Sequence, residues 1–133
     1  MTAGAVAIAP AVEHVTIVEI EPLVPKSVAA YFGDYNYHVV DSPKVTMRID
    51  DGRHFLLTTR QKYDVITSDP LDPWIKGAAT LFTEEFFRVI RAHLNPGGVL
   101  TQFVQLYGSN DDAVKSEIGT FMTARGRVQR PAC

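Results

Sequence analysis

The stretch YDVITSDPLDP, at residues 63–73, decides the fold of this chain. Its first six residues are rich in β-branched side chains, which predicts a buried strand. The two prolines that follow forbid a regular helix. Residues 69–73 are therefore expected to form a rigid loop that carries two carboxylates, Asp69 and Asp72, just beyond the end of the strand.

Strands and helices alternate on both sides of this stretch. We predict a strand buried on both faces at residues 15–20 and a second strand at residues 45–49. The strand at residues 63–68 is the third, and a fourth is predicted at residues 99–106. Helices are predicted within residues 1–12, 22–32, 54–57, 83–94 and 114–121, with Phe86, Phe87, Ile90 and Leu94 as the buried stripe of the fourth. This alternation indicates βαβ units and a mostly parallel sheet. We expect a single partial α/β domain over residues 1–133, with a core at about 4–107 and a helix and irregular tail over 108–133.

Composition narrows the functional classes. The net charge of -2 gives no electrostatic reason to expect nucleic acid as a partner. The one cysteine, Cys133, cannot form an intrachain disulfide, and with four scattered histidines it does not make a metal site. The apolar first twelve residues lack a preceding Lys or Arg, so they do not read as a signal peptide.

Acidic residues follow three successive predicted strands. In an open parallel sheet, ligands bind beyond the carboxyl ends of the strands. Glu19 can accept both hydrogen bonds of a ribose diol there, although a solvated strand end explains it equally well. Asp51 and Gly52 can form a turn with positive φ and accept from an exocyclic amine, but Asp-Gly is also a common plain turn, and Asp50 is an equally acidic neighbour.

The paired acids of the 69–73 loop and a glutamine carry the most chemistry. Two carboxylates held together repel unless a cation joins them, and a diamine or polyamine is such a cation. The alternative is a capped turn with two solvated acids. Gln102 stands inside an apolar strand, so its amide has to be satisfied by a ligand or by a neighbouring loop.

At these residues the chain resembles a known family. The ordered set VEIEP, VTMRIDDG, YDVITSDPLDP, LFTEEFF and NPGGVLTQ is similar to the catalytic core of the spermidine synthase (polyamine aminopropyltransferase) family over about residues 4–107. The resemblance implies a Rossmann-like class I S-adenosylmethionine-dependent methyltransferase fold, truncated at both ends. Its absent first strand would lie between the strands that end at Glu19 and Asp69, which would leave unpaired edges and favour a homo-oligomer.

The resemblance also implies roles for individual residues. Asp69 would be the catalytic proton acceptor, and Asp72 and Gln102 would bind the amine substrate. Glu19 would hold the ribose of decarboxylated S-adenosylmethionine, the co-substrate. Asp51 and Gly52 would contact its adenine. Neither a prosthetic group nor a metal is implied.

The resemblance further implies a small diamine such as putrescine as the acceptor and a cytoplasmic enzyme. Residues 74–79 replace the family's usual Gly-Pro-Ala element, which leaves the amine specificity open and suggests divergent bacterial members, some of them fused to membrane segments. Two alternatives stay open. One is a methyltransferase that uses intact S-adenosylmethionine, and the other is an inactive fragment of a larger synthase-like protein.

Overall fold

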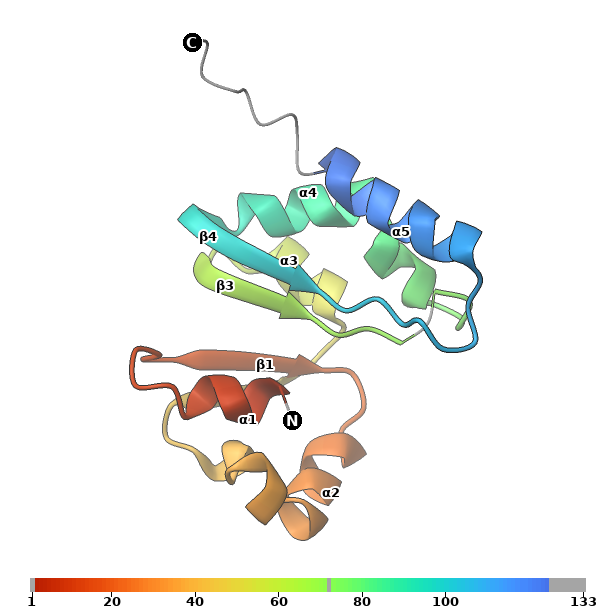
Figure 1. The fold of residues 1–133 in the computed structure, drawn as a ribbon. Helices are drawn as coiled ribbons and strands as arrows, with labels where there is room; N and C mark the ends of the chain where they lie inside the picture. The colour runs from red at the N-terminus through yellow and green to blue at the C-terminus, as the bar shows by residue number, and fades with distance from the viewer. Residues whose placement is uncertain (1, 72, 125–133) are drawn as a thin grey trace. The chain divides into compact units, whose positions relative to one another are not determined.

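The computed structural model describes residues 2–71 and 73–124. Helices and strands alternate along the chain, as the sequence predicts (Figure 1). The strands are β1 (Val15–Glu19), β2 (Val45–Ile49), β3 (Tyr63–Ser68) and β4 (Leu94–Gln102). The α-helices are α1 (Thr2–Ala7), α2 (Leu23–Tyr31), α3 (Gly52–Thr58), α4 (Glu84–Ala92) and α5 (Asp111–Ala124). The chain divides into two units, Met1–Phe55 and Leu56–Cys133, and the division falls within α3.

The first unit is built on a parallel pair of strands, β1 and β2, in a register that runs from Val15 opposite Val45 to Glu19 opposite Ile49. Helix α1 packs against β1, which confirms that the apolar N-terminal run forms a helix on a sheet. The expectation that the first strand is buried on both faces is wrong. Every residue of β1 is only half-buried, because β2 is its one strand partner in the described part of the chain.

Helix α2 follows Pro22, and its end at Tyr31 agrees with the prediction. The Phe32 amide donates to the Val28 carbonyl at 3.0 Å and closes the last turn. Pro25 is tolerated because it lies in the first turn, where backbone N–H groups have no partner within the helix. Val24, Val28 and Phe32 are apolar and lie four positions apart, but they do not build a core. None of the residues of α2 is buried, and Phe32 just beyond it is exposed.

The second unit pairs β3 with β4, again in parallel. Thr83 caps α4 by accepting from the Phe86 amide at 3.2 Å, and the predicted stripe residues Phe86, Phe87 and Ile90 are buried. The fourth stripe residue, Leu94, instead begins β4. The pairing has an irregularity between Tyr63 and Val65, and residues 95–98 of β4 contain the positive φ of Gly97.

Strand β4 ends at Gln102, four residues before the predicted end at 106. Its partner explains the difference. Strand β3 ends at Ser68, whose carbonyl accepts from the Phe103 amide at 2.9 Å, and Pro70 beyond it has no N–H to donate. The predicted helix after residue 107 is confirmed as α5, which packs on α4 and brings Phe121 edge-on to Phe87 with ring centres 5.3 Å apart.

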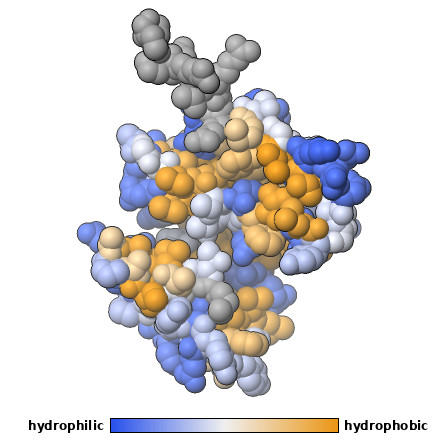
Figure 2. All heavy atoms as spheres, in the orientation of Figure 1, coloured by the Kyte–Doolittle hydropathy of each residue, from blue (hydrophilic) through white to orange (hydrophobic). Residues whose placement is uncertain are grey.

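The four strands form two separate two-stranded sheets among the described residues. Strands β1 and β3 therefore each keep a backbone edge without a strand partner, as the family resemblance implies. Apolar side chains are visible on the surface (Figure 2). Examples are Ile20 in the first unit and Val65 in the second. In residues 2–71 and 73–124 there is no helix of the length and apolar character that crossing a membrane requires.

Candidate functional site

Glu19 lies at the carboxyl end of β1, beside the turn that follows β2. Its backbone carbonyl accepts from the Asp50 amide at 3.0 Å, which extends the ladder by one bond. Its half-buried side chain accepts from the Glu21 amide through Oε1 at 3.0 Å. Glu21 in turn accepts from the Leu23 amide at 2.9 Å and so leads into α2. Among the described residues, one hydrogen bond, from the Glu21 amide, holds the Glu19 carboxylate at the strand end.

The two acids after β2 have different local partners. Asp51 accepts from the His54 amide through Oδ1 at 2.9 Å and so caps the first turn of α3. Asp50 accepts from the Asp51 amide at 2.8 Å and contacts the His54 ring Nδ1 at 2.9 Å. Both acids therefore hold the turn between β2 and α3. Asp51 caps the helix through a backbone amide, whereas Asp50 contacts the ring of His54.

Gly52 does not have positive φ, which the sequence allowed as one of two interpretations of the Asp51-Gly52 turn. It begins α3 in helical conformation, and the glycines with positive φ in the described chain are Gly77, Gly97 and Gly108. The Asp51 side chain closes the turn by capping the helix, so the backbone needs no left-handed residue. A Cβ added at Gly52 would meet no atom within 4 Å, so the position is open in front of α3.

Asp69 directly follows β3 and is exposed. The 69–73 loop was expected to close a buried strand, but β3 is exposed at Asp64, Val65 and Thr67. The described residues therefore leave the Asp69 carboxylate exposed to water. Asp72, its predicted partner, lies outside the described residues. The loop beyond turns at Gly77, with φ of 94°, into a short 3-10 helix, η3 (Ala78–Phe82).

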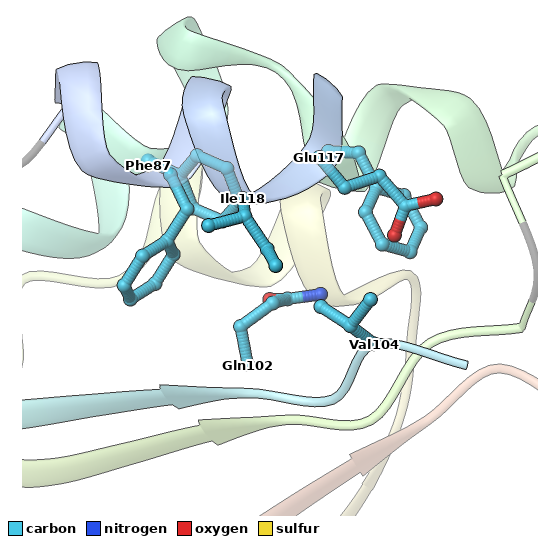
Figure 3. Close-up of a pocket in the computed structure, with 7 residues that line it drawn as sticks. Phe87, Gln102, Val104, Glu117 and Ile118 are labelled. Carbon is cyan, nitrogen blue, oxygen red and sulfur yellow. The ribbon is translucent and has the colours of Figure 1, made fainter. Parts of the chain in front are cut away.

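Gln102 lies opposite Ser68 in the β3–β4 register, so Asp69 and Gln102 leave the sheet at the same edge. The Gln102 side chain points toward α5, between Ile118 and Val104 (Figure 3). Its Nε2 donates to the Phe103 carbonyl at a long 3.4 Å, and its buried Oε1 meets no donor among the described residues. Leaving a buried acceptor unpaired costs about 1–3 kcal/mol. The sequence left a ligand and a neighbouring loop open as partners of this amide, and no described loop donates to its Oε1.

The structure thus gathers the predicted site residues in two groups. Glu19, Asp51 and Gly52 lie at the carboxyl edge of the β1–β2 pair, in the first unit. Asp69 and Gln102 lie at the carboxyl edge of the β3–β4 pair, in the second. Sequence reasoning missed the pocket beside Gln102, to which Phe82 and Glu117 contribute. The spacing of Val114, Ile118 and Phe121 indicated the helix but not that its inner face would stay partly uncovered.

Both groups of residues lie in the part of the chain that matches a known protein family. A family model for the spermine/spermidine synthase domain matches residues 3–118. The chain belongs to this family. Within the described residues, no group of three or more His, Cys, Asp and Glu side chains is arranged to hold a metal ion.

Members of the synthase family are similar to the chain over most of its length. A polyamine aminopropyltransferase of Pseudomonas syringae pv. tomato is 38% identical over 102 residues, covering 73% of this chain and 35% of the relative. Polyamine aminopropyltransferase 1 of Pseudomonas aeruginosa is 35% identical over 111 residues, covering 80% of this chain and 38% of the relative. The chain therefore spans little more than a third of the length of these synthases.

Solved structures of synthases share the fold. A spermidine synthase from Thermotoga maritima superposes with a TM-score of 0.71 at 22% identity, covering 87% of this chain and 38% of the other. A spermidine synthase in complex with the transition state analogue AdoDATO gives a TM-score of 0.78 at 22% identity, covering 87% and 39%. These matches bear out the Rossmann-like fold and its truncation relative to the synthases.

Proposed function

We propose that this chain is the catalytic core of a polyamine aminopropyltransferase, which moves an aminopropyl group from decarboxylated S-adenosylmethionine to a diamine such as putrescine. One observation carries the proposal: Asp69 and Gln102 leave the same edge of a parallel strand pair, in a segment that matches the synthase family. The names of the Pseudomonas relatives support the same reaction.

The proposed step is a displacement at carbon. The amine nitrogen forms a bond to the aminopropyl carbon beside the sulfonium, the carbon–sulfur bond breaks, and its electron pair stays on sulfur as a neutral thioether. The nitrogen loses a proton, which Asp69 accepts. An alkylammonium has a pKa near 10 and an ordinary aspartic acid one near 3.9, so complete transfer beforehand would cost on the order of 8 kcal/mol. Transfer coupled to attack lowers that demand.

Because Asp69 is exposed, the proposed reaction requires that other groups cover its carboxylate. A base in water is stabilised in its charged form, while a covered one is not. We propose that bound amine and the further segments present in the longer synthases cover Asp69, and that Asp72 holds the amine beside it. Gln102 would line the same region from the neighbouring strand.

The first unit would bind the nucleoside end of the co-substrate. Glu19 is proposed to accept from the ribose hydroxyls. Among the described residues its carboxylate accepts one hydrogen bond, from the Glu21 amide, so it can still accept others. Asp51 uses Oδ1 to cap α3, which leaves Oδ2 for the adenine amine. The open space at Gly52 would let the base approach the helix start closely.

A chimera tests this function directly. Residues 3–118 would replace the matched segment of the P. syringae synthase, which restores the length that the chain lacks. The chimera should convert putrescine to spermidine with decarboxylated S-adenosylmethionine and should ignore intact S-adenosylmethionine. Methyl transfer from the intact compound would instead favour the methyltransferase reading. A folded chimera with neither activity would point to an inactive fragment.

A further inference from the structure

A pocket in the second unit lies beside Gln102, between β4, α4 and α5 (Figure 3). It is partly open to solvent and has a volume of about 160 Å³. Gln102 ends the strand that pairs with β3, and Asp69 follows β3 at the same edge of the sheet. The pocket therefore shares Gln102 with the region to which the proposed function assigns the amine, within a single unit.

The walls of the pocket combine apolar side chains with one negative charge. Apolar surface comes from η3, α4 and α5, through Phe82, Phe87, Ile118 and Phe121. Among the described residues that line the pocket, Glu117 is the charged one, and it is half-buried on α5. A concave site with apolar walls and a single carboxylate suits a ligand that has an apolar body and a positive charge.

Two side chains in these walls can accept hydrogen bonds from such a ligand. Gln102 Oε1 is buried and meets no donor among the described residues. Glu117 already interacts within the chain, but a carboxylate has about four lone-pair sites and can accept from a ligand as well. An alkylammonium brings three N–H donors and a positive charge. The pocket therefore offers an ammonium both a counter-charge and an acceptor that the described protein leaves unpaired.

We propose that this pocket holds the far end of the acceptor diamine and that Glu117 pairs with its second ammonium. This inference rests on the transferase function proposed above. The reacting amine would lie at Asp69, and the methylene chain would pass Gln102 along the apolar walls. The second nitrogen is charged at neutral pH, because the pKa of an alkylammonium is about 10, and it would meet the carboxylate of Glu117. Glu117 would thus determine specificity, since a monoamine of the same length lacks the group that it recognises.

Ligand-observed NMR on the full 133-residue chain tests the inference, since saturation transfer is measurable even if the chain associates. Putrescine and 1-aminobutane are titrated separately, because they share a four-carbon chain and differ in the second ammonium. We expect putrescine to bind saturably and about tenfold more tightly than 1-aminobutane, the scale of one hydrogen bond to a charged group. Glu117→Gln should weaken putrescine binding by about the same factor, leave 1-aminobutane unchanged and so remove the preference.

A matched variant separates this contact from general attraction of a dication to an acidic helix. Asp112→Asn removes the same charge from α5 at an exposed position outside the pocket, so the preference for putrescine should persist. Ile118→Trp should narrow the pocket and weaken both amines, whereas Met122→Trp, which does not line it, should not. The inference is overturned if putrescine fails to saturate, or if Glu117→Gln keeps the preference of the unaltered chain.

The chimera distinguishes a failure of this inference from a failure of the transferase function. Glu117→Gln in the chimera should raise the KM for putrescine about tenfold and leave kcat unchanged, as lost ground-state binding does. An active chimera whose KM does not respond to Glu117→Gln would refute the role of Glu117 and leave the function standing. A chimera without transfer activity would refute the function, while a preference for putrescine that depends on Glu117 would still support a diamine site in this pocket.

Discussion

Ser68 and Gln102 lie opposite each other across the parallel β3–β4 ladder, and the Phe103 amide donates to the Ser68 carbonyl at 2.9 Å as its last bond. This register sets where both strands stop. It also places the acid after β3 and the amide that ends β4 at one edge, the place where open parallel sheets bind ligands. Backbone pairing therefore positions Asp69 and Gln102, the two described residues of the second unit with proposed transfer roles.

Asp69→Asn should lower the transfer rate of the chimera by at least about a hundredfold, the scale of a lost general base. The amide keeps the size of the side chain but cannot accept the proton. Steady-state formation of spermidine measures the change. Asp112→Asn, at an exposed position on α5, is the matched control and should leave turnover unchanged. Near-normal turnover in the Asp69 variant would remove its role as the base.

Asp72→Asn should chiefly raise the KM for the amine, because a residue that holds the ground-state ammonium contributes binding rather than chemistry. The measurement is the dependence of the initial rate on putrescine concentration at saturating co-substrate. A normal KM with a collapsed kcat would mean that Asp69 and Asp72 exchange roles.

Gly52→Ala should separate folding from binding at the start of α3. A Cβ there meets no protein atom within 4 Å, so unfolding in urea should be unchanged or slightly harder. If the adenine approaches this position, the added methyl should weaken binding of the nucleoside thioether, as measured by calorimetry on the chimera. Equal affinity in both proteins would show that no ligand comes close to Gly52.

Gly4→Ala should destabilise the first unit by about 1–3 kcal/mol, the usual cost of overpacking. A Cβ at Gly4 would clash with the side chain and the carbonyl of Asn36, which is itself buried. Denaturant unfolding measures the change. Gly119→Ala, where a Cβ meets no atom within 4 Å, is the control and should stabilise α5 by about 0.5–1 kcal/mol. Equal stability of the two variants would contradict the close packing of α1.

The 133-residue chain by itself should associate, bind thioether weakly and show no measurable transfer. Strands β1 and β3 each expose a backbone edge, and unpaired edges recruit other strands. Size-exclusion chromatography with light scattering measures the mass, and a coupled thioether assay measures transfer. A stable monomer that makes spermidine would refute this prediction.

The sequence alone determined the secondary structure where local pattern suffices. The bounds of β2 and β3 and the buried stripe of α4 follow from β-branched runs and from apolar residues at helical spacing. The acids at the strand ends, and with them the family, could also be read directly, because they follow the strands in the chain.

Only the tertiary structure decided properties that depend on a partner distant in sequence. Strand β4 stops where its partner β3 stops. Strand β1 is half-buried because one strand pairs with it among the described residues. Asp69 is exposed, which its sequence motif did not indicate, because burial depends on the segments packed around a residue. Gly52 is helical because Asp51 caps α3. The pocket beside Gln102 likewise depends on how α5 packs over β4. Burial and pairing are relations between segments, so periodicity within one segment cannot specify them.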